Sequence, residues 1–462
     1  MRPLADTPAL HPEDRPALVH GDRRWTFGDL DARSAAWARA LVARGVRGDD
    51  LVAFSLPNGP DFIALTFAIY RAGATPAPIS GKLPAAERDA ILAVMQPRLF
   101  VDAVNLPGEP SPGYEPRPVA MSWKACTSGG STGRPKVIVD GRPAAFAEGS
   151  EFIAIPANEA VLVPGPLYHN APFSAAVFAL WRGNTLVTMD RFDAEGALRL
   201  IAREHVVWSI MVPTMLHRIR KLPASVRAAI DLSRWRTVVH TAATMPDWLK
   251  RDWIDWRGAD HIWEVYGATE GLVRCWIGGA EWLERPGSVG RPVGGARLRI
   301  LDDRGADVPT GTIGEVFAMP AGGPRSSYRY IGAESRATAD GWESVGDCGR
   351  VDADGYLYLA DRRTDLIISG GVNIWPAEVE AALLRHPEIL SCAVFGEADD
   401  DLGQRVHAVV QARDPVTLDE VSAFLRSHLA REKIPRAITC RTDAVRDDAG
   451  KFRKPVSQKV AP

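Results

Sequence analysis

The 462-residue chain has few cysteines, and they follow no pattern. The five residues are odd in number and widely separated: Cys126, Cys275, Cys348, Cys392 and Cys440. No Cys-x-x-Cys pair occurs, which argues against a disulfide framework and against a cysteine-rich zinc site. Unpaired thiols are typical of a reducing compartment, so we expect a cytoplasmic protein.

The chain also lacks an excess of charge of either sign. Its 55 basic residues, mostly arginine, nearly balance 57 acidic residues and leave a formal net charge of -2. No global basic field would therefore recruit nucleic acid or an anionic membrane, and we expect neither as a partner. The polar, proline-containing stretch from Met1 to Arg15 predicts no secretory signal.

Long hydrophobic runs are nearly absent as well. Residues 160–181 form one stretch of 22 residues without a formal charge. Pro164, Pro166, Pro172 and His169 interrupt it. Because a spanning helix must satisfy its backbone hydrogen bonds internally, this stretch predicts no membrane span.

The chain does have a loop rich in glycine and hydroxyl groups, residues 127–136, Thr-Ser-Gly-Gly-Ser-Thr-Gly-Arg-Pro-Lys. Glycines let backbone N–H groups turn inward into a nest for phosphate oxygens. Arg134 and Lys136 add positive charge. The loop is not a Walker A motif, because Pro135 separates Gly133 from Lys136. Taken alone, its composition fits a flexible surface turn too.

Strand and helix patterns alternate along the first part of the chain. Residues 30–46 and 61–72 are expected to be helical. Extended segments are expected at 51–56, 75–79, 184–189 and 206–212. This alternation predicts an α/β fold with parallel sheets covered by helices on both faces, and the chain length predicts more than one domain.

The short charged run Asp361–Asp365 predicts a hinge. It would separate an N-terminal domain, residues 1–361, from a C-terminal domain, residues 362–462. In the second unit we expect helices from Pro376 and from the capping box at 417–420, and strands at 390–395, 406–411 and from Ile438 onward. These elements predict a small α+β domain.

Several short motifs are weak when taken singly. Tyr266-Gly-Ala-Thr-Glu270 follows an apolar strand, residues 261–265; its aromatic ring can stack on a base and its carboxylate can hold Mg²⁺. The others fit a turn, an ion pair, a loop and a hairpin as readily: Gly346-Asp347, Asp361-Arg362, Gly370-Gly371 and Gly450-Lys451. Their order and spacing carry the signal.

In that order the chain resembles the adenylate-forming superfamily of acyl-CoA synthetases, peptide-synthetase adenylation domains and luciferases. The resemblance runs from Trp25-Thr26-Phe27 to Lys451. It implies a large N-terminal domain of stacked α/β sheets with a small β-barrel-like part, and a small mobile α+β C-terminal domain. It also implies ATP-dependent conversion of a carboxylic acid to acyl-AMP with Mg²⁺, then transfer to coenzyme A with release of AMP.

The same resemblance implies a nucleotide-binding set. The phosphate loop would contribute Thr127, Ser128, Gly129, Gly130, Ser131, Thr132, Gly133 and Lys136. The adenine would lie between the backbone shelf after His240, made of Thr241, Ala242 and Ala243, and Tyr266 with Gly267. Asp347 and Arg362 would hold the ribose hydroxyls.

Catalytic roles follow from the same motifs. Thr269 would contact the α-phosphate, and Glu270, with Thr132, would hold Mg²⁺. Lys451 would be the mobile catalytic lysine; its competitor Lys454 does not follow a glycine. Gly370 and Gly371 would line the coenzyme A tunnel. The hinge position would be Thr364, where the family usually has Asp or Lys.

The acyl pocket would be formed by His169, Asn170, Ala171, Phe173, Val212, Thr241, Gly267 and Trp276. His169 would gate the junction with the thiol tunnel, although a packed histidine is an alternative. Peptide-synthetase domains place an aspartate at the position of Asn170, so an α-amino acid is disfavoured here. We interpret Asp193 as a helix N-cap and not as that aspartate.

The segment Pro166–Pro172 resembles ligases for bulky alicyclic acids, including bile acids. This suggests a polycyclic, terpenoid or steroid-like acid, with fatty and aryl acids left open. A basic stretch would serve coenzyme A or be ordinary surface: Arg431, Lys433, Arg436, Arg441 and Arg446. Carrier-protein loading and a non-catalytic binding protein are the alternatives, and a homodimer is left open.

Overall fold

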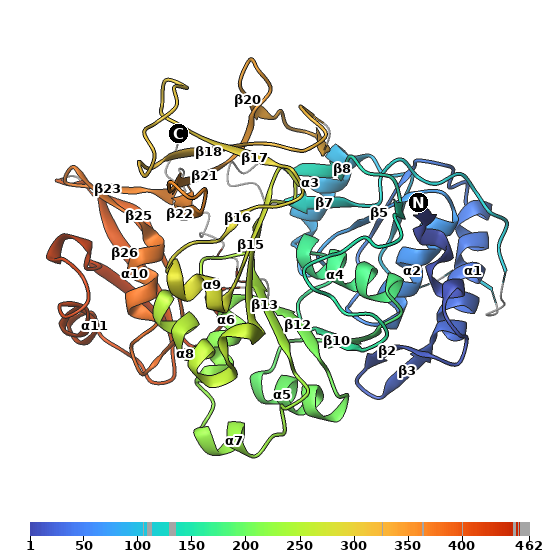
Figure 1. Cartoon of the computed structure of the whole chain (residues 1–462), viewed down its shortest axis with the longest axis horizontal. Helices are drawn as coiled ribbons and strands as arrows, with labels where there is room; N and C mark the ends of the chain where they lie inside the picture. Colours follow the sequence, from blue (N-terminus) through green and yellow to red (C-terminus); the bar gives the residue numbers. More distant parts are fainter. Residues whose placement is uncertain are drawn as a thin grey trace.

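The computed structural model describes residues 1–104, 106–108, 113–128, 135–325, 327–362, 365–399, 401–446, 450 and 452 (Figure 1). At 128, 361 and 362 it describes the backbone alone. Large blue-to-yellow and small orange-to-red parts lie side by side (Figure 1). The predicted mixed α/β architecture with a small C-terminal domain is confirmed.

A nine-stranded sheet forms the centre of the large part. Its order is β16 (Arg291–Pro292), β15 (Arg274–Gly278), β14 (Ile262–Gly267), β13 (Thr237–Thr241), β12 (Trp208–Met211), β10 (Ala160–Val163), β11 (Thr185–Thr188), β2 (Pro16–His20) and β3 (Arg23–Thr26). The strands from β14 to β2 run parallel, as the alternating pattern predicts. Both edges are antiparallel.

Helices and short turns connect these strands. They are η1 (Leu4–Leu10), α1 (Phe27–Ala43), α2 (Pro60–Arg71), α3 (Ala85–Met95), α4 (Asn170–Trp181), α5 (Ala194–Arg203), α6 (Pro213–Arg220), α7 (Ala224–Ala228), α8 (Asp247–Arg257), η2 (Ala259–His261) and α9 (Gly279–Glu284). The helix expected at 30–46 begins earlier, because Thr26 and Asp29 form a capping box. Asp193 caps α5 as predicted: its carboxylate accepts from the Gly196 N–H at 2.6 Å.

Smaller sheets flank the central one. One contains β5 (Thr75–Pro78), β4 (Leu51–Phe54) and β6 (Leu99–Val101), and another contains β19 (Tyr328–Ile331), β8 (Lys136–Asp140) and β7 (Ala125–Ser128). A third contains β17 (Arg297–Leu301), β18 (Gly314–Met319), β21 (Glu343–Val351) and β20 (Arg336–Ala337), with β22 (Leu357–Arg362) paired to β21. A two-stranded sheet joins β1 (Arg2–Pro3) to β9 (Ala145–Phe146).

The C-terminal domain has its own sheet and core. The sheet contains β24 (Val372–Ile374), β23 (Ile367–Ser369), β26 (Gly403–Ala412), β25 (Ile389–Asp399) and β27 (Ala437–Arg441), with α10 (Pro376–Leu383), α11 (Leu418–Leu425) and η4 (Arg431–Lys433). Ile367, Val379 and Val410 are among its buried residues. The predicted hinge starts at the end of β22, but 363 and 364 lie outside the described residues, so its position stays a prediction.

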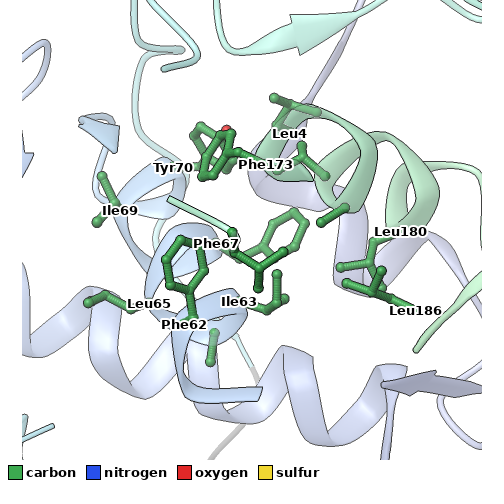
Figure 2. Close-up of a cluster of buried hydrophobic side chains, with 14 of the residues drawn as sticks. Leu4, Phe62, Ile63, Leu65, Phe67, Ile69, Tyr70, Phe173, Leu180 and Leu186 are labelled. Carbon is green, nitrogen blue, oxygen red and sulfur yellow. The ribbon is translucent and has the colours of Figure 1, made fainter. Parts of the chain in front are cut away.

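The largest apolar core lies between the N-terminal helices and the central sheet. Phe62, Ile63 and Phe67 of α2 meet Phe173 of α4 and Leu186 of β11 in it (Figure 2). The stretch 160–181 is not one helix: it is β10, a proline-containing turn and the 12-residue α4. Among the described residues no helix has the length and apolar character to span a membrane. The five cysteines all lie among the described residues and form no disulfide bond.

Candidate active site

The predicted site residues lie at the carboxyl ends of four neighbouring parallel strands. His169 and Asn170 follow β10, Val212 follows β12, Thr241 ends β13, and Gly267 ends β14. The chain passes from β10 to β11 on one side and then to β12 on the other, so the strand order reverses between β10 and β12. Open α/β sheets bind ligands at such a point.

The predicted adenine shelf is an exposed turn after β13. The Thr241 hydroxyl donates to the Val265 carbonyl at 2.8 Å and ties β13 to β14. Ala242 has φ +76°, a conformation that a residue with a Cβ rarely adopts. Ala242 and its neighbour Ala243 are both exposed. A strained, exposed backbone between two rigid strands is available to a flat ligand.

Tyr266, predicted to cover the other adenine face, is held by Asp347. Its hydroxyl donates to Asp347 Oδ2 at 2.7 Å. Asp347 stands opposite Arg362 in the antiparallel β21–β22 register. The structure therefore brings together the residues predicted for adenine and ribose, although they are about 80 to 100 positions apart in the sequence.

Glu270 and Lys136, predicted to serve the metal and the phosphates, meet in the structure. Lys136 Nζ lies 3.3 Å from Glu270 Oε1, and that carboxylate is buried, with 7% of the side chain exposed. Tyr330, which sequence analysis missed, donates to the same oxygen at 2.6 Å and lies 3.0 Å from Lys136 Nζ. Burial, with Glu270 as the next cause, raises the pKa of Tyr330 above its usual range, so its hydroxyl stays a donor.

The donor set fits Mg²⁺ delivered with a nucleotide. Mg²⁺ commonly takes one or two carboxylates and completes its shell with substrate phosphates and water. Glu270 supplies one carboxylate, and its two hydrogen bonds both go to Oε1. The described residues contain no cluster of three acidic, histidine or cysteine side chains that would hold a metal alone.

Asn170, predicted for the acyl pocket, is tied to a buried lysine that sequence analysis missed. Lys124 Nζ donates to Asn170 Oδ1 and, at 2.9 Å, to the Ser174 hydroxyl. The ammonium group lies 3.8 Å from Asp140 and only 5% of the Lys124 side chain is exposed. Burial lowers the pKa of Lys124, and Asp140 opposes that shift. With its oxygen engaged, the amide presents its NH₂ group as a donor.

The other acyl-pocket predictions divide into two groups. Ala171 and Trp276 lie at the margin of the large core, and Val212 and Gly267 lie at strand ends. Phe173 does not join them: it is 1% exposed and its ring lies 6.3 Å from Phe62 in the core. It lies in the core because α4 is buried on every side from Phe173 to Leu180.

The two C-terminal motifs are placed differently. A Cβ built on Gly450 would lie 3.7 Å from Val212, so the position before Lys451 adjoins the site. A Cβ on Gly371 would meet no atom within 4 Å. Lys451, Gly129, Gly130, Ser131, Thr132 and Gly133 lie outside the described residues, as do the side chains of Ser128 and Arg362.

Two cations of the predicted coenzyme A surface have internal partners instead. Arg446 pairs with Glu380 at 2.6 Å and is 18% exposed, and Lys433 pairs with Glu378 at 2.7 Å. The local sequence gives no sign of an ion pair between distant segments. Helix caps and strand ends, in contrast, have a local sequence pattern.

Comparisons with known proteins agree with this geometry. A family model described as AMP-binding enzyme matches residues 4–120 and 125–322, and one described as AMP-binding enzyme C-terminal domain matches 378–451. The chain therefore belongs to the AMP-binding enzyme family. Within it, the chain is an AMP-forming acid–thiol ligase that uses ATP and coenzyme A.

Two relatives and one solved structure illustrate the similarity. Feruloyl-CoA synthase of an Amycolatopsis species is 32% identical, covering 91% of each chain. The 3-[(3aS,4S,7aS)-7a-methyl-1,5-dioxo-octahydro-1H-inden-4-yl]propanoyl:CoA ligase of Mycobacterium tuberculosis is 31% identical, covering 96% of this chain and 95% of the relative. The o-succinylbenzoate CoA synthetase of Bacillus subtilis, solved with its acyl-adenylate, has a TM-score of 0.79 at 25% identity, covering 98% and 97%.

Proposed function

We propose that this ligase activates a bulky, hydrophobic, ring-bearing carboxylic acid, polycyclic or steroid-like, and transfers it to free coenzyme A. The observation that carries the proposal is the site around Asn170. Among the described side chains, Lys124 donates to its amide oxygen, and behind Lys124 lie the carboxylate of Asp140 and a second cation, Arg142. This excess of positive charge disfavours the α-ammonium group of an amino acid. It favours an acid that, apart from its carboxylate, is uncharged or carries hydrogen-bond acceptors.

The first step joins the acid to ATP. Mg²⁺ on Glu270 would offset phosphate charge when bound. Lys136 faces the same carboxylate and would pair with phosphate oxygens that enter between them. Lys451 would stabilise the charge that builds on the carboxylate and α-phosphate oxygens, a contribution typically worth about 10²–10³ in rate. Pyrophosphate leaves and acyl-AMP remains.

In the second step, the thiol of coenzyme A attacks the acyl-AMP. AMP leaves as the thiolate sulfur bonds to the carbonyl carbon. Gly370 and Gly371 would line the path of the pantetheine arm, since a residue without Cβ leaves room for it. Gly371 is open in the present arrangement, so this step requires the C-terminal domain to turn.

The relatives are named for varied acids, among them a long-chain fatty acid and sulfoacetate. Some of them, together with Asn170, support a ring-bearing acid. Three relatives are named for a phenolic acid, an aromatic dicarboxylic acid and a methyl-dioxo-octahydroindenyl propanoic acid. All three carry a ring and a hydrogen-bond acceptor beyond the carboxylate, and the free amide NH₂ of Asn170 is a matching donor. A fatty acid offers it no partner.

The test is pyrophosphate release from the purified full-length chain over an acid panel, with and without coenzyme A. The panel contains ferulate, o-succinylbenzoate, the methyl-dioxo-octahydroindenyl propanoate, cholate and palmitate. We expect release and acyl-CoA with a ring-bearing acid and little with palmitate. Acyl-AMP without acyl-CoA would instead favour carrier-protein loading, and no release with any acid would favour a binding protein.

Two variants separate the steps. Lys451→Ala should suppress acyl-AMP formation by about 10²–10³ and spare thioester formation from supplied acyl-AMP. Gly371→Leu should do the reverse. Equal losses in both steps would overturn this assignment. The mass of the protein in solution, by light scattering, tests whether the chain forms a homodimer.

A further inference from the structure

Helix α6 contacts the C-terminal domain at both of its ends. At its start, a Cβ on Gly450 would lie 3.7 Å from Val212 and from the Thr214 hydroxyl. At its end, His217 and Lys221 reach the segment after α10. Figure 1 shows α6 and α8 beside α10. This short helix therefore connects the acyl site to the far end of the small domain's first helix.

The C-terminal end of α10 receives donors from the N-terminal domain. Trp248 Nε1 on α8 donates to the Ala381 carbonyl at 3.0 Å. Lys221 Nζ donates to the carbonyls of His386 and Pro387, each at 3.1 Å. The last carbonyls of a helix have no partner within it and carry partial negative charge, so N–H donors and a cation stabilise them.

His217 adds a third contact to the same end. Its ring nitrogens lie 3.2 Å from the carbonyl oxygens of Leu384 and Leu390, and its ring meets Trp248 edge-on at 5.8 Å. A neutral imidazole has a single N–H, so it donates to one of these carbonyls. The three side chains together bind carbonyls at the domain interface, of which the His386 carbonyl also accepts from the Ile389 N–H at 3.3 Å.

A second set of bonds links α10 to Gly450. Arg446 pairs with Glu380 of α10 at 2.6 Å. The same guanidinium donates to the Gly450 carbonyl at 2.9 Å and to the Cys392 carbonyl at 2.8 Å. Because Gly450 directly precedes Lys451, the placement of α10 determines where the chain enters that residue.

The hairpin that would serve the thiol faces elsewhere in this arrangement. The side chains of Ile368 and Val372, on either side of the Gly370–Gly371 turn, are 52% and 36% exposed. Gly450, and not this hairpin, adjoins the end of β12. The contacts on α6 and α8 therefore belong to one of the two arrangements that the reaction needs.

We propose that His217, Lys221 and Trp248 form a latch that holds the C-terminal domain in the arrangement for acyl-AMP formation. They are positioning residues: they bind the end of α10, which orients Gly450 through Glu380 and Arg446. The inference rests on the proposed function, because it assigns the latch to the first of its two steps. The latch must open before the thiol step, so weakening it slows the first step alone.

The test compares the two half-reactions in Trp248→Phe and Lys221→Met, each of which removes a donor and keeps most of the side chain's bulk. Acyl-AMP formation is measured as pyrophosphate release with the panel acid that the unmodified chain uses fastest. We expect each variant to lower it about fivefold and the double variant more, since one hydrogen bond is worth about 1 kcal/mol. Thioester formation from supplied acyl-AMP should stay within about twofold.

The matched control is Trp256→Phe on the same helix. Trp256 packs against Trp253 and Arg220 of the N-terminal domain. It should leave the ratio of the two rates unchanged. Equal losses in both steps, or a ratio in the latch variants equal to that in Trp256→Phe, would overturn the proposal.

Hydrogen exchange provides a measurement that needs no substrate. In the full-length chain, amides of residues 376–390 should exchange faster in the latch variants than in Trp256→Phe, because α10 loses partners. Unchanged exchange would refute the latch. Faster exchange in a chain that releases no pyrophosphate with any acid would support the docking contact and refute the proposed function instead.

Discussion

The buried ammonium group of Lys124 donates a hydrogen bond to the side-chain oxygen of Asn170, 46 positions away. The bond joins the residue before β7, the strand that leads into the phosphate loop, to the first residue of α4. It fixes which end of the amide is presented at the strand ends. The segment that handles the nucleotide thereby also sets the polarity of the candidate acyl site.

Lys124→Met retains a long side chain beside Trp123 and removes the donor. We expect the KM for a ring-bearing acid with an acceptor to rise about tenfold, because a hydrogen bond to a charged group is worth about 1.5–3 kcal/mol. The KM for ATP should change little. Pyrophosphate-release kinetics measure both, and Ser174→Ala, which leaves the Lys124–Asn170 bond, is the control. Equal rises for acid and ATP would contradict the assignment.

Tyr330→Phe should weaken use of MgATP. The variant keeps the ring near Lys136 but removes the hydroxyl that donates to Glu270 at 2.6 Å. A loss of about 1.5–3 kcal/mol corresponds to a rate about 10- to 100-fold lower at subsaturating ATP. The control is Tyr328→Phe, whose hydroxyl bonds Glu343 instead. A similar loss in both variants would indicate a general disturbance of β19.

Lys250→Met should destabilise the fold beneath the adenine shelf. Lys250 Nζ pairs with Glu264 at 2.5 Å, and both side chains are buried. Burial raises the pKa of Glu264 and lowers that of Lys250, so each depends on its partner to stay charged. Breaking such a pair costs about 3–5 kcal/mol.

Denaturant unfolding measures the effect of Lys250→Met, and Lys250→Met/Glu264→Gln is the comparison. Glu264→Gln removes the charge that the first change leaves unpaired, so the double variant should regain most of the loss. A double variant less stable than Lys250→Met would show that Glu264 has another partner.

Acidification should weaken the domain contact at His217. Burial, with Lys221 as the next cause, lowers the pKa of His217 to about 4 in the docked arrangement, against about 6.5 for a free imidazole. The docked ring therefore binds fewer protons than the free ring. Docking is fully favourable above pH 6.5 and is lost as the pH falls toward 4.

The ratio of acyl-AMP formation to thioester formation, measured from pH 7 to pH 5, reports this loss. It should fall with pH in the unmodified chain and fall less in His217→Asn, which cannot titrate. Identical pH profiles for the two proteins would contradict a role for His217 in docking.

Much of the fold followed from local pattern. Thr417 and Asp193 cap the helices that they precede, and the alternating segments form the predicted parallel strands. These features depend on neighbours within about four positions, which a sequence displays directly. Helix ends differed by a few residues because caps, more than hydrophobicity, decide them.

The site was only partly foreseeable. The motif order placed Glu270, Tyr266 and Asp347 in a nucleotide site, and the structure brings the first of them to Lys136 and the other two together. The motif order could not find Tyr330 or Lys124, since a lone tyrosine in a strand or a lone lysine before one has no distinguishing pattern. Phe173 was assigned to the pocket by its position in a motif, but α4 is buried on every side from this residue onward, which places Phe173 in the core.

By itself, the sequence determined the alternation of strands and helices, the helix caps and the ordered motifs of an adenylate-forming enzyme. Only the tertiary structure decided which distant side chains meet: Lys124 with Asn170, Tyr330 with Glu270, and Trp248 with the end of α10. The physical reason is that sequence periodicity specifies which face of an element is apolar. Which elements become neighbours depends on how all the faces are buried at once.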